Sequence, residues 1–319
     1  MIDPFVDIEW VREHRDEVVL ADCRWYADER SGREAYLAGH IPGAVFVDLE
    51  TALSRHQDAA LGGRHPLAEP ADFAAAMGAL GIGDDDTVIA YDDAGGVIAA
   101  RLVWMLRATG HEAALLDGGL AAWDGELDPG PPAAVDLTPG RPGAVDLTSG
   151  YRAKGRPHGG RRAEGRPRGG RRAEGRPRGG ELTATFTARP WPAELLASID
   201  ETAAAAAGGG TVIDARPGER FAGAPDHLDP RPGHIPGSRS VPCRENVDAD
   251  GRLLPAADLR ARFAVDDATE VISSCGSGVT ACHNLLAMEQ AGLGRGRLFP
   301  GSWSQWSRDP GRPVQIGVG

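Results

Sequence analysis

The chain has 319 residues, which is too many for one small core and enough for two domains of ordinary size. Its formal net charge of -12 argues against general affinity for nucleic acid or anionic lipid, because neither polyanion gains from an acidic surface. No stretch approaches the roughly 18 to 20 apolar residues that a membrane span requires. The chain has only 4 cysteines, which we interpret as reduced thiols, so we expect a cytoplasmic protein.

Short apolar runs alternate with helix-like stretches along both halves of the chain. The sequence predicts buried strands at 18–22, 88–92, 211–214 and 271–275, and helices at 99–109 and 279–291. Such alternation is typical of a parallel sheet covered by helices. We therefore predict the α/β class for both domains.

The two halves repeat the same signals in the same order. Gly-His-Ile-Pro-Gly occurs at 39–43 and again at 233–237. Asp92 precedes Gly118 by 26 positions, and Cys275 precedes Gly301 by the same number. Equal spacing indicates two copies of one domain, in which Asp92 and Cys275 take equivalent places where a strand ends and a helix begins. Ligands bind at such places in α/β sheets.

The segment between the halves, residues 129–182, is rich in Gly, Pro and Arg. Three ten-residue units fill 151–180, where eleven Lys/Arg stand against two Glu, a local charge of about +9. Without aliphatic residues this segment buries too little surface to fold, so we predict a disordered basic linker between domains 1–128 and 183–319. An arginine-rich arm that touches RNA or the protein's own acidic surface is the alternative.

The segment from Ser274 to Thr280 places a thiol, Cys275, at the end of a predicted strand and directly before a helix. Glycines let the backbone curl so that successive N–H groups point at the sulfur, and the helix N-terminus adds a positive dipole end. This environment stabilises a thiolate and a persulfide anion. The backbone expected to hold the sulfur and its donor comprises Gly276, Gly278, Val279 and Thr280.

Two other interpretations of Cys275 are open. Many free cysteines are simply small buried apolar residues, although a core position would not need Gly-x-Gly beside it. Phosphatases of the Cys-x5-Arg type use a similar loop with an arginine six residues after the nucleophile. Ala281 stands at that position, and without a guanidinium to bind phosphate, phosphoryl transfer is disfavoured.

Two further motifs carry a family resemblance over nearly the whole chain outside the linker. Tyr-Leu-Ala-Gly-His-Ile-Pro-Gly-Ala at 36–44 and Phe-Pro-Gly-Ser-Trp-Ser-Gln-Trp at 299–306 resemble the N-terminal and C-terminal signatures of tandem-domain rhodaneses. The resemblance implies two rhodanese-like domains, each a parallel sheet flanked by helices. It also implies that only the second domain is catalytic, in agreement with Asp92 at the equivalent place in the first.

The loop after Cys275 separates two branches of the family. Thiosulfate enzymes resembling rhodanese proper have Arg and Lys where Gly276 and Ser277 stand, so this loop is closer to that of 3-mercaptopyruvate sulfurtransferases. The resemblance then assigns the donor carboxylate to Arg216 and Arg220, and guanidinium groups suit bidentate carboxylate recognition. Either arginine could instead be a structural ion-pair partner.

By the same resemblance, a proton relay near Cys275 comprises Ser277, His65 and an acid, the last two from the first domain. The acid falls on Glu50, where the family form has aspartate, and Asp48 is a rival. Asp92 follows the histidine of its Gly-His-Ile-Pro motif by 52 positions, whereas Cys275 follows the equivalent histidine by 41, which fits a loop in the first half that reaches the other domain.

The sequence therefore predicts an enzyme that moves a sulfane sulfur from 3-mercaptopyruvate, through a Cys275 persulfide, to cyanide, a small thiol or reduced thioredoxin. Thiosulfate as donor is the first alternative. A persulfide relay or sensor that never turns over a small donor is the second. We expect a monomer that requires no metal or organic cofactor.

Overall fold

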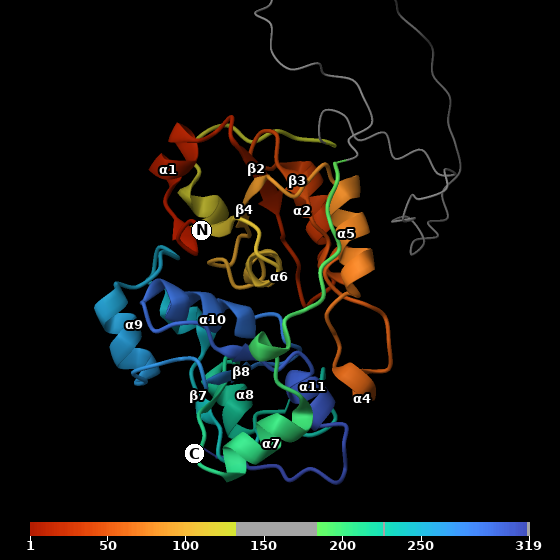
Figure 1. The fold of residues 1–319 in the computed structure, drawn as a ribbon, viewed down its shortest axis with the longest axis vertical. Helices are drawn as coiled ribbons and strands as arrows, with labels where there is room; N and C mark the ends of the chain where they lie inside the picture. Colours follow the sequence, from red (N-terminus) through yellow and green to blue (C-terminus); the bar gives the residue numbers. More distant parts are fainter. Residues whose placement is uncertain (132–183, 226, 318–319) are drawn as a thin grey trace, which may run out of the picture.

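The computed structural model describes residues 1–131, 184–225 and 227–317. These residues form two α/β domains, each with its own parallel sheet (Figure 1). The predicted fold class is confirmed. The repeats at 151–180, and with them residues 132–182 of the predicted linker, lie outside the described residues, and the domain boundaries stay predictions. No described helix combines the length and apolarity needed to cross a membrane.

In the first domain, the described strands form a parallel sheet in the order β1-β5-β4-β2-β3. The central strand β4 is buried from Val88 onward, the near-continuous burial typical of parallel strands covered on both faces. The elements are β1 (Phe5–Val6), α1 (Ile8–Glu13), β2 (Val18–Asp22), α2 (Gly32–Ala38), β3 (Val45–Phe46), α3 (Leu49–Ala52), α4 (Ala59–Gly62), α5 (Pro70–Ala79), β4 (Thr87–Tyr91), α6 (Ala100–Ala108), β5 (Ala113–Leu116) and the 3₁₀ helix η1 (Gly119–Ala122).

In the second domain, the described strands form a parallel sheet in the order β7-β6-β8-β9. Strand β8 pairs with β6, Asp214 opposite Ser274, as β4 pairs with β2 in the first domain. The elements are η2 (Ala193–Leu195), α7 (Ile199–Ala207), β6 (Val212–Asp214), α8 (Gly218–Ala222), β7 (Arg239–Ser240), η3 (Cys243–Asn246), α9 (Ala256–Phe263), β8 (Ile272–Ser274), α10 (Ala281–Gln290), β9 (Arg297–Leu298) and α11 (Ser302–Trp306).

The two domains share one hydrophobic core at their interface. Helices α6 and α10 pack against each other between the sheets, and Leu102 and Leu286 belong to the same buried cluster (Figure 1). Helix α4 of the first domain also contacts α11 of the second. Since α6 and α10 follow the loops that begin at Asp92 and Cys275, their packing brings both loops to the interface.

The chain described from residue 184 runs along the first domain before it enters the second. The backbone N–H of Ala184 donates to the Gly78 carbonyl at 3.2 Å, and the Thr187 hydroxyl donates to Asp84 at 2.6 Å. The Trp191 indole then donates to the Ala68 carbonyl at 2.9 Å. Residues 184–191 therefore help to tie the second domain to the first.

Candidate active site

Cys275 follows β8 directly and precedes α10 by a short loop, as the sequence predicts. The Gly278 N–H donates to the Cys275 Sγ at 3.1 Å, and it is the one amide contact recorded for this sulfur among the described residues. Gly278 has φ +79°, and a Cβ there would lie 2.3 Å from the Pro300 carbonyl oxygen, so only glycine fits. The loop thus aims a backbone dipole at the sulfur.

The segment around α11 holds the backbone of this loop through hydrogen bonds. The Cys275 N–H donates to the Ser302 hydroxyl at 3.0 Å, and the Trp303 N–H donates to the Cys275 carbonyl at 3.0 Å. The Ser304 N–H donates to the Gly276 carbonyl at 2.8 Å. The C-terminal signature motif therefore orients the catalytic loop and leaves the sulfur free to react.

Asp92 occupies in the first domain the place that Cys275 occupies in the second. One carboxylate oxygen of Asp92 accepts from the amides of Ala94 and Gly96 at 2.8 Å, and the other from Ile98 and Ala99 at 2.7 and 2.9 Å. The loop after Asp92 therefore forms a nest of four amides, although burial still raises the pKa of this carboxyl. The loop after Cys275 differs from the prediction of several amides, because among the described residues only the Gly278 amide contacts the sulfur. In the first domain the nest is filled by the protein's own carboxylate, which supports an inactive first domain.

The other cysteines are poor nucleophiles. Burial raises the pKa of Cys243 and of Cys282 to about 12, and it also raises the pKa of Cys23 well above the usual thiol value. Each is therefore a protonated thiol near neutral pH. Although Cys243 lines the same cavity as Cys275, it does not compete as a thiolate.

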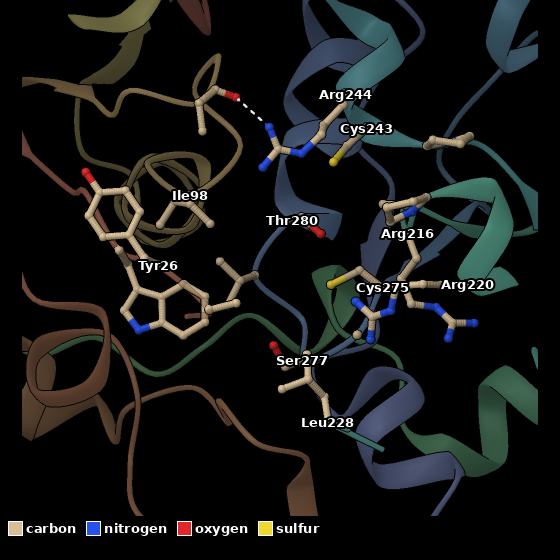
Figure 2. Close-up of a pocket in the computed structure, with 18 of the residues that line it drawn as sticks. Tyr26, Ile98, Arg216, Arg220, Leu228, Cys243, Arg244, Cys275, Ser277 and Thr280 are labelled. Atoms are coloured by element: carbon tan, nitrogen blue, oxygen red, sulfur yellow. Dashed lines mark hydrogen bonds between the residues drawn. The ribbon is translucent and has the colours of Figure 1, made fainter. Parts of the chain in front are cut away.

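A cavity of about 1040 Å³ lies between the domains and includes Cys275 in its wall (Figure 2). Only 1% of Cys275 is exposed, so the sulfur is reached through this cavity. The predicted residues that line it are Glu50, His65, Arg216, Arg220, Gly276, Ser277, Val279 and Thr280. Gly278 does not line the cavity, because its amide turns to the sulfur itself.

The predicted relay crosses the domain interface. The Ser277 Oγ lies 2.7 Å from the His65 Nδ1, and the His65 Nε2 lies 3.0 Å from the Glu50 Oε1. A carboxylate only accepts, so the neutral imidazole carries its proton on Nε2 and Nδ1 accepts from Ser277. The Ser277 hydroxyl can then pass a proton to His65 and take one from a donor thiol.

The structure decides between the two candidate acids. Asp48 caps α3, where its Oδ1 accepts from the amides of Glu50 and Thr51 at 2.9 and 3.0 Å, so it does not reach the relay. Glu50 contacts His65 and also accepts from the Trp25 indole at 3.0 Å. Burial acts to raise the pKa of Glu50, but the hydrogen bonds from His65 and Trp25 outweigh it and the pKa lies below its usual value. Glu50 is thus a carboxylate at neutral pH.

Arg101 on α6 is a site residue that the sequence analysis missed. Its fully buried guanidinium donates to the Gly278 carbonyl at 2.8 Å and to the His65 carbonyl at 3.0 Å. One side chain thus joins the cysteine loop to the relay histidine across the interface. Burial lowers the pKa of Arg101, although it is far too basic to lose its charge. The available signal was a pair of arginines, Arg101 and Arg107, in an otherwise apolar helix.

Arg216 is held by a buried ion pair. Its Nη2 lies 2.7 Å from the Asp214 Oδ2 and donates to the Gly233 carbonyl at 2.8 Å. Arg24 in the first domain pairs with Asp22 in the same way. Arg216 is therefore a structural ion-pair partner, the second of the two roles considered from the sequence. Because it also lines the cavity, its role in binding the donor stays a prediction.

The side chain of Asp229 is 2% exposed and contacts arginines from both domains. Arg308 lies 3.0 Å and Arg220 3.6 Å from its carboxylate, and Arg64 of the first domain pairs with it too. Figure 2 shows Arg216 and Arg220 on the same side of Cys275. The wall beside the sulfur is consequently cationic.

Comparison with known proteins agrees with this fold and site. The model of the rhodanese-like domain matches residues 7–126 and again 192–309, so the chain belongs to the rhodanese-like family as a tandem member. A Pseudomonas aeruginosa relative, provisionally named a 3-mercaptopyruvate sulfurtransferase, is 35% identical over 94% of this chain and 93% of its own. A Mycobacterium tuberculosis relative, provisionally named a thiosulfate sulfurtransferase, is 36% identical over 95% and 92%.

A solved structure shows the same arrangement. The 3-mercaptopyruvate sulfurtransferase from Leishmania major superposes with a TM-score of 0.74 at 28% identity, covering 96% of this chain and 74% of that one. The predicted family is confirmed.

Proposed function

We propose that the protein is a sulfurtransferase that takes sulfur from 3-mercaptopyruvate and carries it as a persulfide on Cys275. The observation that carries this proposal is the 2.7 Å contact between Ser277 and His65, because it places a proton relay beside the thiol in one cavity. A thiol donor needs such a relay, whereas thiosulfate has no proton to lose. The relatives' names support sulfur transfer as the reaction class.

The first half-reaction begins with the Cys275 thiolate attacking the sulfur of the donor. As the new S–S bond forms, the C–S bond of 3-mercaptopyruvate breaks and its electron pair leaves with the carbon fragment as the enolate of pyruvate. The donor's thiol proton passes to Ser277 while the Ser277 proton moves to His65, and Glu50 stabilises the imidazolium. The same proton can return to the enolate carbon and yield pyruvate.

The second half-reaction regenerates the thiolate. A thiophilic acceptor attacks the outer sulfur of the persulfide, and the S–S electron pair returns to Cys275. Cyanide would leave as thiocyanate, and a small thiol or reduced thioredoxin would leave as its own persulfide. The Gly278 amide, 3.1 Å from the Cys275 sulfur, stabilises the thiolate that is released. We propose that the enzyme acts as a monomer.

We further propose that the protein works in the cytoplasm. All four cysteines are free thiols in the structure, which fits a reducing compartment. The acidic net charge of -12 supports small or protein partners over nucleic acid.

Steady-state kinetics test the proposed function. The wild-type enzyme should form thiocyanate from 3-mercaptopyruvate and cyanide with many turnovers per Cys275, at a kcat/KM at least tenfold above that for thiosulfate. Cys275→Ser should abolish both activities. A tenfold preference for thiosulfate would reassign the donor, and a single turnover without recycling would instead make the protein a persulfide relay.

A further inference from the structure

Ser304 lies on α11 of the second domain, where that helix contacts α4 of the first (Figure 1). Its side chain is fully buried. The hydroxyl oxygen accepts the backbone N–H of Arg64 at 3.0 Å, and the hydroxyl donates to the Gly301 carbonyl at 3.0 Å. The backbone N–H of Ser304 donates to the Gly276 carbonyl at 2.8 Å. One residue is therefore bonded to both domains.

The two backbone segments that Ser304 holds lead into the two ends of the relay. Gly276 comes directly before Ser277. Arg64 comes directly before His65. The 2.7 Å contact between the Ser277 Oγ and the His65 Nδ1 thus completes a closed path of bonds that begins and ends at Ser304. Moving either segment away from Ser304 would change that distance.

The segment that carries His65 approaches α11 closely enough for this bond because a glycine stands in it. Gly63 has φ +86°, and a Cβ there would lie 2.5 Å from the Gly301 carbonyl oxygen and 2.8 Å from the Ser304 Oγ. Only glycine therefore lets the backbone pass the hydroxyl at this distance.

The hydroxyl of Ser304 is needed for the contact with the first domain. It uses its one proton on the Gly301 carbonyl and a lone pair on the Arg64 N–H. Among the described residues, no other acceptor is recorded for that N–H. Arg101 still holds the His65 carbonyl from α6, so loss of the hydroxyl would shift the segment without releasing it.

We propose that Ser304 is a positioning residue that sets the distance between the Ser277 hydroxyl and the His65 Nδ1. This inference rests on the proposed sulfur transfer, in which those two groups exchange the donor's proton. Ser304 does not line the cavity, so it contacts neither the donor nor the reacting sulfur. It acts through the geometry of the relay, where a displacement of about 1 Å can slow the reaction by about 100-fold.

The kinetic experiment compares Ser304→Ala with wild type, using 3-mercaptopyruvate and thiosulfate as donors. We expect kcat for 3-mercaptopyruvate to fall by about 10- to 100-fold with KM nearly unchanged, because the donor's proton has a longer path to His65. The kcat for thiosulfate should stay within about 3-fold, since that donor has no proton to lose. Ser304→Cys keeps the volume but weakens the acceptor, so it should change kcat in the same direction.

Two neighbours of Ser304 offer matched controls. Ser307 is also buried, but its hydroxyl has no hydrogen-bond partner in the part of the chain that the structure describes, so Ser307→Ala should stay close to wild type. The Gln305 amide donates to the Leu61 carbonyl on α4 at 2.9 Å, which joins the same two helices away from the relay. Losses in Gln305→Ala equal to those in Ser304→Ala would show that only the docking of α4 matters, and would overturn the proposal.

A double-mutant cycle tests whether Ser304 acts through the relay. In a Ser277→Ala background, Ser304→Ala should change kcat for 3-mercaptopyruvate by less than about 2-fold, because the contact that it positions is already absent. An undiminished loss in that background would refute the proposal. So would an unchanged kcat when Ser304→Ala is made alone.

A spectroscopic measurement separates this proposal from the proposed function. The nitrogen chemical shift of the His65 Nδ1 reports its hydrogen bond with Ser277 without any turnover, and His65→Gln identifies the signal. Ser304→Ala should move this shift toward its value in Ser277→Ala, whereas Ser307→Ala should not. An unmoved signal in folded Ser304→Ala would refute the positioning role. A moved signal, in a protein whose wild type never forms thiocyanate, would refute the sulfur transfer alone.

Discussion

Ser277 and His65 are 212 positions apart in the chain and belong to different domains, yet their Oγ and Nδ1 atoms lie 2.7 Å apart. The nucleophile's loop comes from one copy of the repeat, and the base beside it comes from the other. The interface is therefore part of the active site, and the predictions below test how its parts act.

Ser277→Ala should slow 3-mercaptopyruvate turnover by about 100-fold, the usual size of a lost proton transfer. Thiosulfate turnover should fall less than about 3-fold, because that donor has no proton to remove. Steady-state rates with both donors check this. Equal losses with both donors would show that the hydroxyl only shapes the loop.

Glu50→Gln should lower kcat for 3-mercaptopyruvate by about tenfold, because the imidazolium of His65 loses its stabilising charge. The pKa of Glu50 lies below its usual value. The carboxylate is therefore charged at any pH above the usual glutamate pKa, and it is protonated only when the pH falls through the lowered pKa. The loss should therefore still be present at pH 6. A loss that disappears as the pH falls to 6 would show that Glu50 is already protonated there.

Arg101→Met should cost both activity and stability, whereas Arg107→Met should cost stability alone. Arg101 joins the Gly278 and His65 carbonyls, and Arg107 pairs with Glu289 across the same interface but away from the site. Each change leaves buried hydrogen-bond acceptors without a donor, and each unsatisfied group lowers the free energy of unfolding by about 1–3 kcal/mol. Urea unfolding and turnover of the folded protein check this, and full activity of Arg101→Met would contradict a positioning role.

Asp92→Ala should destabilise the first domain by about 3 kcal/mol or more, because four amides lose their acceptor together. Added sulfate should restore part of the loss by entering the emptied nest. Thermal unfolding with and without sulfate measures both effects, with Asp93→Ala as a control outside the nest. A variant as stable as wild type would mean that the loop relaxes without an anion.

The sequence allowed the repeat, both sheets and the position of Cys275 to be predicted, because the spacing from Asp92 and from Cys275 to the following glycine is the same. The predicted helices at 99–109 and 279–291 correspond to α6 and α10 within two residues. Local apolar patterns and turn residues determine such elements. The family and the sulfurtransferase class followed from the motifs.

Contacts between domains could not be predicted in the same way. Asp48 and Glu50 are two positions apart, and only the direction of α3 decides which carboxylate caps the helix and which reaches His65. Arg64 and Asp229 meet through the docking of the two domains, which no local pattern records. The ion pair of Arg216 could have been found, since Asp-x-Arg occurs in both halves, at 22–24 and 214–216.

The carboxylate of Asp92 shows that the two copies of the domain have different roles. A domain that closes its own anion site can no longer hold a reactive sulfur, but it keeps the surface that supplies His65, Glu50, Arg64 and Arg101 to its neighbour. Neither half expressed alone would then contain a complete enzyme. Each half depends on the packing of α6 against α10 for the site to be assembled.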